Sequence, residues 1–264
     1  MISQDIEALS LAFCTSFLYN EEMTVTIDNF LGGKVKLAQS KEGYRATSDS
    51  VLLSSAVLAK EGESVLDVGT GNGVVLFCLA ERVPNLDMIG VDVQSDLLEL
   101  ALQNNELNQQ NIRFILGDIS EKSSDIHGKQ FHHVVTNPPF YRDGKGRLNE
   151  QQRIAFHETI SIEKWIRFCV KHIRAGGTFT MIHQMEALPE ILSAIQKTSL
   201  GAVEVIPLVK DLNTPAKRII IRAKLGSKKP FILYNPFVLH QSDGQSYTEK
   251  AEGILRFGYA LDDK

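Results

Sequence analysis

The sequence lacks paired cysteines, long apolar runs and internal repeats. Its 3 cysteines are far apart and form no C-x-x-C pair, which argues against a disulfide framework or a thiolate zinc site. The 7 histidines include no H-E-x-x-H spacing, so we expect no metal site. No apolar run approaches the roughly 18 residues that span a bilayer, and the longest candidate, Val203–Val209, contains Glu204 and Pro207. We therefore expect a protein without membrane segments.

A secretory signal and an overall positive charge are also missing. The first residues include Asp5 and Glu7 and no basic segment, so we expect a cytoplasmic protein. The net charge is −4, from 28 basic and 32 acidic residues, which argues against a protein coated in positive charge. Positive charge is instead local, because no Asp or Glu occurs between Leu212 and Ser242. The stretch Arg142–Arg153 is a second basic segment.

The composition is that of a globular chain with a sizeable core. The chain has 264 residues, of which 43% are hydrophobic and 23% are charged. Residues 24–47 hold the short β-like runs Thr24–Ile27, Lys34–Ala38 and Tyr44–Thr47, which predict a small hairpin or sheet. A helix is predicted over residues 48–60. We therefore predict an N-terminal extension over residues 1–60 that packs on a main domain over residues 61–264.

From residue 63 onward, apolar strands alternate with helices. The predicted strands are Ser64–Val68, Met88–Val93, Ile112–Leu116, Phe131–Thr136, Thr178–His183, Val203–Val209 and Arg218–Ala223. One predicted helix ends near Val83. The other predicted helices span Ser95–Leu107, Ile162–Ile173, residues 186–199 and Glu249–Phe257. This alternation predicts an α/β Rossmann-like fold with a seven-stranded, mostly parallel sheet. A loop joins the last two strands, which predicts an antiparallel strand at one edge.

A glycine-rich turn follows the first of these strands and spans Asp67–Gly73. Its glycines let the backbone turn tightly and approach a ligand at the carboxyl end of a parallel strand. Asp92 and Asp118 end the next two strands, so we expect these acids at the same edge of the sheet. Asp92 is suited to accept hydrogen bonds from ribose hydroxyls, and Asp118 from an adenine amino group. An acid at Asp67 would repel a pyrophosphate but suits a cation, which favours S-adenosylmethionine over a nicotinamide cofactor.

The most specific motif is Asn137-Pro138-Pro139-Phe140, which follows the fourth strand. Two prolines stiffen the backbone. The Asn137 side chain and the Pro138 carbonyl can then accept both protons of a planar NH₂ group. This arrangement would direct the nitrogen lone pair at a methyl donor, while Phe140 offers a face on which a base can stack. The motif predicts methyl transfer to a planar amine or amide.

With these motifs, the sequence resembles the class I methyltransferases that carry an Asn-Pro-Pro-aromatic motif, and among them the bacterial valine-tRNA adenine-N6 methyltransferases. The similarity extends to Tyr44–Leu53 before the sheet and to the tail between Leu239 and Leu255. The resemblance implies a Rossmann-like class I methyltransferase fold, S-adenosylmethionine as cofactor and tRNA as partner. It implies the catalytic residues Asn137, Pro138, Pro139 and Phe140. It implies the cofactor-binding residues Ser48, Asp49, Asp67, Gly69, Thr70, Gly71, Asn72, Gly73, Asp92, Val93, Asp118, Ile119 and Asn137.

The substrate implied by the resemblance is an anticodon-loop adenine of valine tRNA, methylated at N6. The stretches 142–153 and 217–229 are the candidates for phosphate contacts. The individual candidates for nucleic-acid contact are Arg45, Arg142, Lys145, Arg147, Arg153, Lys217 and Arg218. We assign Trp165 and its helix to packing.

Two other substrates remain open at this point. One is a glutamine side chain of a protein, as in the release-factor glutamine N5-methyltransferases, and the other is an adenine of ribosomal RNA or DNA. The glutamine enzymes typically end the motif in Tyr and carry a longer N-terminal helical domain. The Phe140 residue and the short segment before the sheet therefore favour a nucleic-acid adenine.

Overall fold

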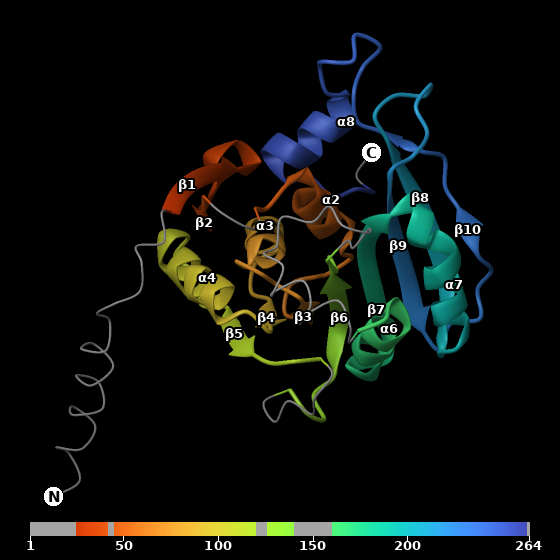
Figure 1. Ribbon diagram of the computed structural model, residues 1–264, viewed down its shortest axis with the longest axis horizontal. Coiled ribbons are helices and arrows are strands. Elements are labelled where there is room, and N and C mark those ends of the chain that lie inside the picture. Colours follow the sequence, from red (N-terminus) through yellow and green to blue (C-terminus); the bar gives the residue numbers. More distant parts are fainter. Residues whose placement is uncertain (1–24, 42–44, 120–125, 140–159, 263–264) are drawn as a thin grey trace, which may run out of the picture.

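The computed structural model describes residues 25–41, 45–119, 126–139 and 160–262 (Figure 1). Its strands are β1 (Val25–Phe30), β2 (Val35–Ser40), β3 (Ser64–Val68), β4 (Asp87–Asp92), β5 (Arg113–Leu116), β6 (Phe131–Thr136), β7 (Ile173–Gln184), β8 (Leu200–Val209), β9 (Arg218–Leu225), β10 (Ile232–Leu233) and β11 (Phe237–Val238). Its α-helices are α2 (Ser48–Ala56), α3 (Val74–Arg82), α4 (Ser95–Leu107), α6 (Ile162–Lys171), α7 (Leu188–Gln196) and α8 (Glu249–Glu252), which a π-helical turn (Gly253–Phe257) continues.

The main sheet confirms the predicted Rossmann-like fold. In the described residues its strand order is β10-β8-β9-β7-β6-β3-β4-β5, and β11 also pairs with β8. All seven predicted strands are present, and the short β10 and β11 bring the count to nine. The strand β9 runs antiparallel to both β7 and β8, so it lies inside the sheet rather than at its edge. Its residues Ile219, Ile220 and Ile221 are fully buried, which suits an interior position.

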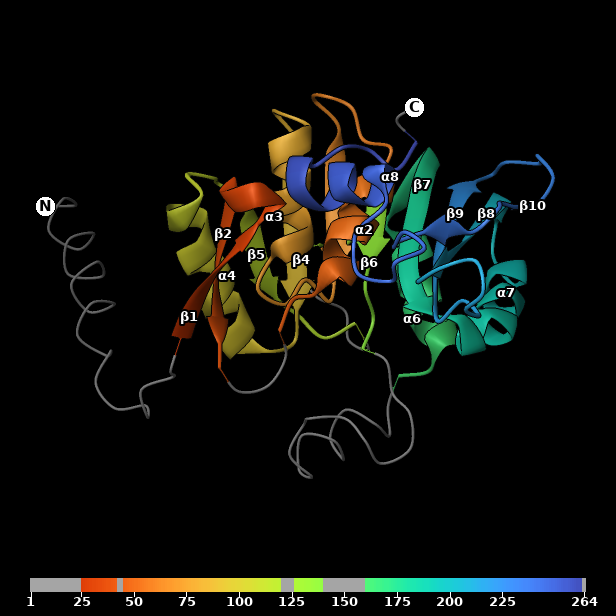
Figure 2. The ribbon, with the colours of Figure 1, turned by 90° about the horizontal axis from the view of Figure 1, so that it is seen from above.

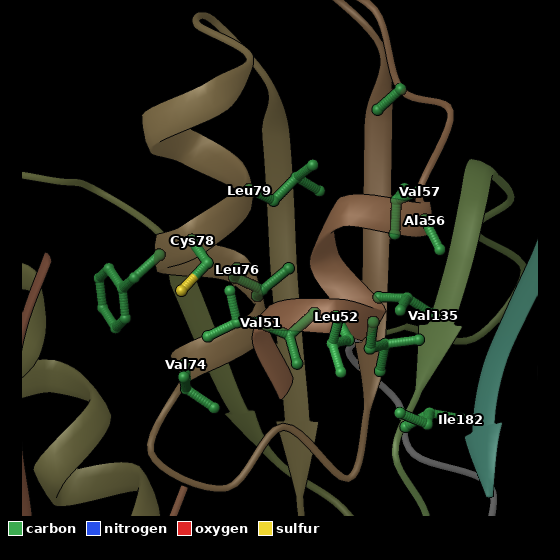
Figure 3. Packing of buried hydrophobic residues seen from close by; sticks show 14 of the residues in the cluster. Val51, Leu52, Ala56, Val57, Val74, Leu76, Cys78, Leu79, Val135 and Ile182 are labelled. Carbon is green, nitrogen blue, oxygen red and sulfur yellow. The ribbon is translucent and has the colours of Figure 1, made fainter. Parts of the chain in front are cut away.

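Helices cover both faces of the sheet. On one face, α2 and α3 pack against the sheet in a single cluster, which contains Val51, Leu76 and Leu79 of the helices and Val135 of β6 (Figure 3). On the other face, α6 and α7 lie side by side and bury Ile166 against the central strands (Figure 2). In the described parts of the chain, no helix is both long and apolar enough to cross a membrane.

The helix α2 ends at Ala56, before the predicted end at residue 60. Val57 is already extended, with φ −75° and ψ 122°. The Arg82 guanidinium donates hydrogen bonds to the carbonyls of Ser54 (2.9 Å) and Val57 (2.7 Å). Arg82 thus satisfies carbonyls that would otherwise need another turn of helix. The early end is a tertiary effect, because the cap comes from α3.

The boundary between α6 and β7 also differs from the prediction. The helix ends at Lys171, and the strand begins at Ile173 instead of Thr178. The strand therefore includes Gly177, which lies between the predicted helix and the predicted strand. A Cβ atom at Gly177 would lie 2.8 Å from the His132 carbonyl oxygen. The glycine thus allows close contact with β6.

The predicted hairpin is confirmed, because β1 and β2 pair in antiparallel fashion. The third run, Tyr44–Thr47, forms no strand in its described residues, Arg45 to Thr47. The buried Asn104 side chain of α4 joins the hairpin to the main sheet. It accepts from Ala38 N (2.6 Å) and donates to the carbonyls of Ala38 (3.3 Å) and Asn72 (3.0 Å). The division of the chain at residue 60 stays a prediction.

Replacing Asn104 should destabilise the fold, since Asn104→Leu leaves the buried Ala38 amide and Asn72 carbonyl without the hydrogen bonds that Asn104 makes to them. We expect a loss of roughly 3 kcal/mol in the free energy of unfolding, because unsatisfied buried groups cost about 1–3 kcal/mol each. Urea denaturation measures the change. The control is Gln103→Ala, at an exposed position of the same helix, which should change stability by less than about 0.5 kcal/mol. Equal stability of the two variants would contradict the assignment.

Candidate active site

The candidate site residues come from four neighbouring strands, β6, β3, β4 and β5, whose carboxyl ends share one edge of the sheet. Asp67 is the fourth residue of β3, and Asp92 is the last residue of β4. Asp118 lies two residues beyond β5, and Asn137 directly follows β6. The structure therefore brings together the acids and the motif that the sequence separates by up to 70 positions.

The glycine-rich loop (residues 69–73) is held against β4 by backbone hydrogen bonds. The amides of Gly69 and Thr70 both donate to the Val91 carbonyl, at 2.9 and 3.0 Å. Gly73 has φ 84°, and a Cβ atom there would lie 2.7 Å from the ring of Phe77. Only glycine fits this position. The loop is thus a fixed element that leads into α3.

Asp67 is fully buried beneath this loop. The Thr70 hydroxyl donates a hydrogen bond to Asp67 Oδ2 at 2.8 Å, while Oδ1 has no partner among the described residues. Burial raises the pKa of the Asp67 carboxyl to about 7, the Thr70 hydrogen bond opposes this rise, and the charge of Asp92 adds to it. An acceptor of this kind favours a cation or a hydrogen-bond donor as its partner.

Asp92 is buried but better satisfied than Asp67. Its Oδ2 accepts from Gly71 N (2.8 Å) and its Oδ1 accepts from Gln94 N (3.0 Å). Burial raises its pKa, and these backbone hydrogen bonds oppose the rise. Beside it, Val93 is 41% exposed, which leaves an apolar surface next to the acid. Asp118 and Ile119 are half-buried at the same edge.

Asn137 presents a second acceptor without a partner. Its Oδ1 is buried and has no hydrogen-bond partner among the described residues. Pro138 after it is buried and Pro139 is half-buried. Phe140, the last residue of the motif, lies outside the described residues. The amide oxygen is thus available to a donor from a ligand.

The structure adds Trp165 to the site, although the sequence analysis assigned it to packing. Its Nε1–H donates to Thr136 Oγ1 at 2.8 Å, and that hydroxyl donates to the Val68 carbonyl at 2.7 Å. Thr136 directly precedes Asn137. The only signal in the sequence is that Trp165 is the single tryptophan of the chain.

Ser48 and Asp49 begin α2 at the same edge of the sheet, where Ser48 is exposed. The Arg218 guanidinium donates from Nε to Asp49 Oδ2 at 2.8 Å. Arg218 is therefore held by an ion pair beside the site. Arg45 is likewise engaged, because its guanidinium pairs with Asp28 of β1. Both arginines, which the sequence predicts as nucleic-acid contacts, thus make hydrogen bonds to acids within the protein.

The basic stretch 217–229 is divided between the two edges of the sheet, and its contact with nucleic acid stays a prediction. Lys217 and Arg218 stand at the start of β9, at the edge that carries the site. Lys224 lies near the end of the same antiparallel strand, at the opposite edge. Arg222 is buried and pairs with Glu204 at 2.7 Å. The other candidates, Arg142, Lys145, Arg147 and Arg153, lie outside the described residues.

A match to a family model bears on the chemistry of this site. The model of the methyltransferase small domain matches residues 45–206, which include the glycine-rich loop, the three acids and Asn137. The chain belongs to the methyltransferase small domain family. It is an enzyme that uses S-adenosylmethionine. In the described residues, no group of three or more His, Cys, Asp or Glu side chains could hold a metal ion.

Similar proteins support the family and the fold. The tRNA1(Val) (adenine(37)-N6)-methyltransferase of Actinobacillus pleuropneumoniae is 22% identical over 227 residues, with coverage of 84% of this chain and 93% of that protein. A release factor glutamine methyltransferase of Lactococcus lactis is 32% identical over 117 residues, which are 44% of this chain and 37% of that one. The crystal structure of a predicted O-methyltransferase from Agrobacterium tumefaciens shares the fold, with a TM-score of 0.67, 20% identity and coverage of 80% and 97%.

The residues present fit S-adenosylmethionine. This cofactor carries a sulfonium, an ammonium group and a nucleoside, and the site offers buried acids and an apolar surface at Val93. Asp67 Oδ1, for which the described ranges supply no partner, suits the cationic end. A Cβ atom at Gly69 would lie 3.0 Å from the Trp165 ring, so a larger residue at this position of the loop would be too close to the indole.

We expect binding of S-adenosylmethionine to depend on pH through Asp67. The carboxylate attracts the cation and the protonated acid does not, so affinity should fall as pH falls through about 7. Between pH 8 and pH 6 the loss should be about tenfold, since the ionised fraction falls by about that factor. Calorimetric titration at each pH measures the affinity of the wild type and of Asp67→Asn for S-adenosylmethionine. Any pH dependence that remains in the variant comes from titration of the ligand itself. A wild-type affinity with the same pH profile as the variant would refute the role.

Proposed function

We propose that this enzyme methylates N6 of an adenine in tRNA, and that the target is the anticodon-loop adenine of valine tRNA. The observation that carries the proposal is the buried Asn137 Oδ1, which has no partner in the described part of the chain and lies at the end of β6, one strand away from the glycine-rich loop. The relatives add support, because the match to the adenine-N6 methyltransferase spans 84% of this chain, whereas the match to the glutamine methyltransferase spans 44%.

The proposed chemistry is a direct transfer to nitrogen. When bound, S-adenosylmethionine supplies a methyl group from its sulfonium. Asn137 Oδ1 accepts a hydrogen bond from the adenine amino group, and the Pro138 carbonyl accepts the second. Both bonds favour a pyramidal nitrogen, whose lone pair forms the new N–C bond as the C–S bond breaks. The proton that leaves the nitrogen passes to solvent. Phe140 would stack on the base.

A base in the anticodon loop is unpaired, so its extrusion into the site is less costly than from a duplex. The phosphates beside it would then approach the edge of the sheet where the site lies. Lys217 is exposed at this edge. The enzyme can therefore bind RNA with a net charge of −4, because only local positive charge is needed.

Replacing Asn137 tests the proposed chemistry. Asn137→Ala removes the acceptor, so we expect kcat on tRNA to fall at least 100-fold, while the dissociation constant for S-adenosylmethionine changes less than threefold. Incorporation of labelled methyl into unmodified tRNA, with recovery of N6-methyladenosine after digestion, measures turnover, and calorimetry measures binding.

The same assay separates the candidate substrates. Unmodified tRNA, ribosomal RNA, DNA and protein from a strain that lacks this gene are offered in parallel. Label in tRNA alone agrees with the proposal. Label in protein, found as N5-methylglutamine, would replace it with the glutamine reading, and label in ribosomal RNA or DNA would move the target to another polymer. Turnover that survived in Asn137→Ala would exclude the proposed role of the motif.

Paired lysine variants test where the RNA lies. Lys217→Ala should weaken tRNA binding and lower the slope of log affinity against log salt by about 1, as for one lost phosphate contact. Lys224→Ala changes another exposed lysine, at the opposite edge of the sheet, and should leave both quantities unaltered. Filter binding between 50 and 200 mM salt measures the slopes. If Lys224→Ala gave the larger effect, the placement of the RNA would be wrong.

A further inference from the structure

Trp165 connects both halves of the active site. It is 7% exposed and lies in the first turn of α6, whose N-terminus is capped by the Ser161 hydroxyl. Its indole has two contacts with the site. The ring lies over Gly69 of the glycine-rich loop, and the Nε1–H donates to Thr136 of β6.

The contact with Gly69 is close. A Cβ atom built on Gly69 would lie 3.0 Å from Cζ2 and 3.2 Å from Cη2 of the indole. The six-membered ring therefore covers the face of the loop backbone that a side chain would otherwise occupy. A change in the position of this loop changes the surroundings of the indole directly.

The hydrogen bonds form a chain from α6 to β3. Trp165 Nε1–H donates a hydrogen bond to Thr136 Oγ1 at 2.8 Å, and the Thr136 hydroxyl donates one to the Val68 carbonyl at 2.7 Å. Thr136 is completely buried, so neither bond has water as a ready substitute. Val68 precedes the glycine-rich loop and Thr136 precedes Asn137. These two hydrogen bonds thus connect the backbone next to the glycine-rich loop with the residue next to Asn137.

We propose that Trp165 is a positioning residue for methyl transfer, which holds Asn137 at a fixed place relative to the glycine-rich loop through Thr136. It contacts neither substrate nor cofactor in this role. Transfer between two bound molecules depends on their alignment, and a misplacement of about 1 Å can cost 100-fold in rate. This inference deepens the proposed function, because its turnover assay uses the tRNA substrate.

The test replaces the hydroxyl and keeps the shape. Thr136→Val removes both hydrogen bonds, and we expect kcat to fall at least tenfold, with KM for tRNA and the dissociation constant for S-adenosylmethionine within threefold of wild type. Thr136→Ser retains the hydroxyl and should restore kcat to within threefold. The control is Thr180→Val, which makes the same change at a buried threonine of β7 and should leave kcat unaltered. A wild-type kcat in Thr136→Val would overturn the proposal.

A spectroscopic signal tests the same contacts without turnover. Trp165 is the only tryptophan, so its emission reports this position alone. Titration with S-adenosylhomocysteine should change the emission, with a midpoint equal to the calorimetric dissociation constant. In Thr136→Val the emission should move to shorter wavelength, because the indole N–H loses its acceptor, and Thr136→Ser should match wild type. If calorimetry shows that the ligand binds and the Trp165 emission does not change, the contact between Trp165 and the loop would be refuted.

The two assays keep this inference separate from the proposed function. If wild-type enzyme labels protein or another nucleic acid instead of tRNA, the proposed function fails. The kcat comparison is then made on the substrate that accepts the methyl group, and the emission titration is unaffected. Equal kcat for wild type and Thr136→Val on that substrate would overturn the inference in the same way.

Discussion

The active site depends on the register between β3 and β6, in which Val68 lies opposite Thr136. This pairing ends both strands at the same level, so the glycine-rich loop and Asn137 emerge side by side. A slip of one residue would turn every side chain of a strand to the other face. The Thr136 hydroxyl, which donates to the Val68 carbonyl, adds a side-chain bond between the same two residues. The two halves of the site therefore depend on one strand pairing.

The site also buries two acidic side chains, which is unfavourable for their charged forms. Asp67 and Asp92 are acids taken out of water, and burial is the main reason that the pKa of each rises. Backbone amides compensate Asp92, whereas the described residues offer Asp67 only the Thr70 hydroxyl. A cationic ligand would supply the missing partner. We therefore expect ligand binding to stabilise this part of the fold, since a ligand that binds only the native state shifts unfolding by mass action.

The folded protein exposes less unpaired positive charge than the basic run in its sequence suggests. Arg222 is buried between Glu204 and Asp262, and Arg218 pairs with Asp49. A run without acids in the sequence thus meets acids from elsewhere in the chain. The antiparallel course of β9 then places the lysines of one stretch at opposite edges of the sheet. No linear pattern contains these partners, so the sequence alone did not show that the fold divides this basic run.

The sequence by itself determined the alternation of strands and helices, the glycine-rich turn, the acids at the strand ends and the motif at Asn137, because apolar period, glycine and proline act over a few residues. Only the tertiary structure decided the early end of α2, the interior place of β9 and the role of Trp165. Arg82 reaches α2 from another helix, and Trp165 reaches Thr136 across 29 residues of sequence. Such contacts follow from strand register and helix packing, which join distant segments and leave no local pattern.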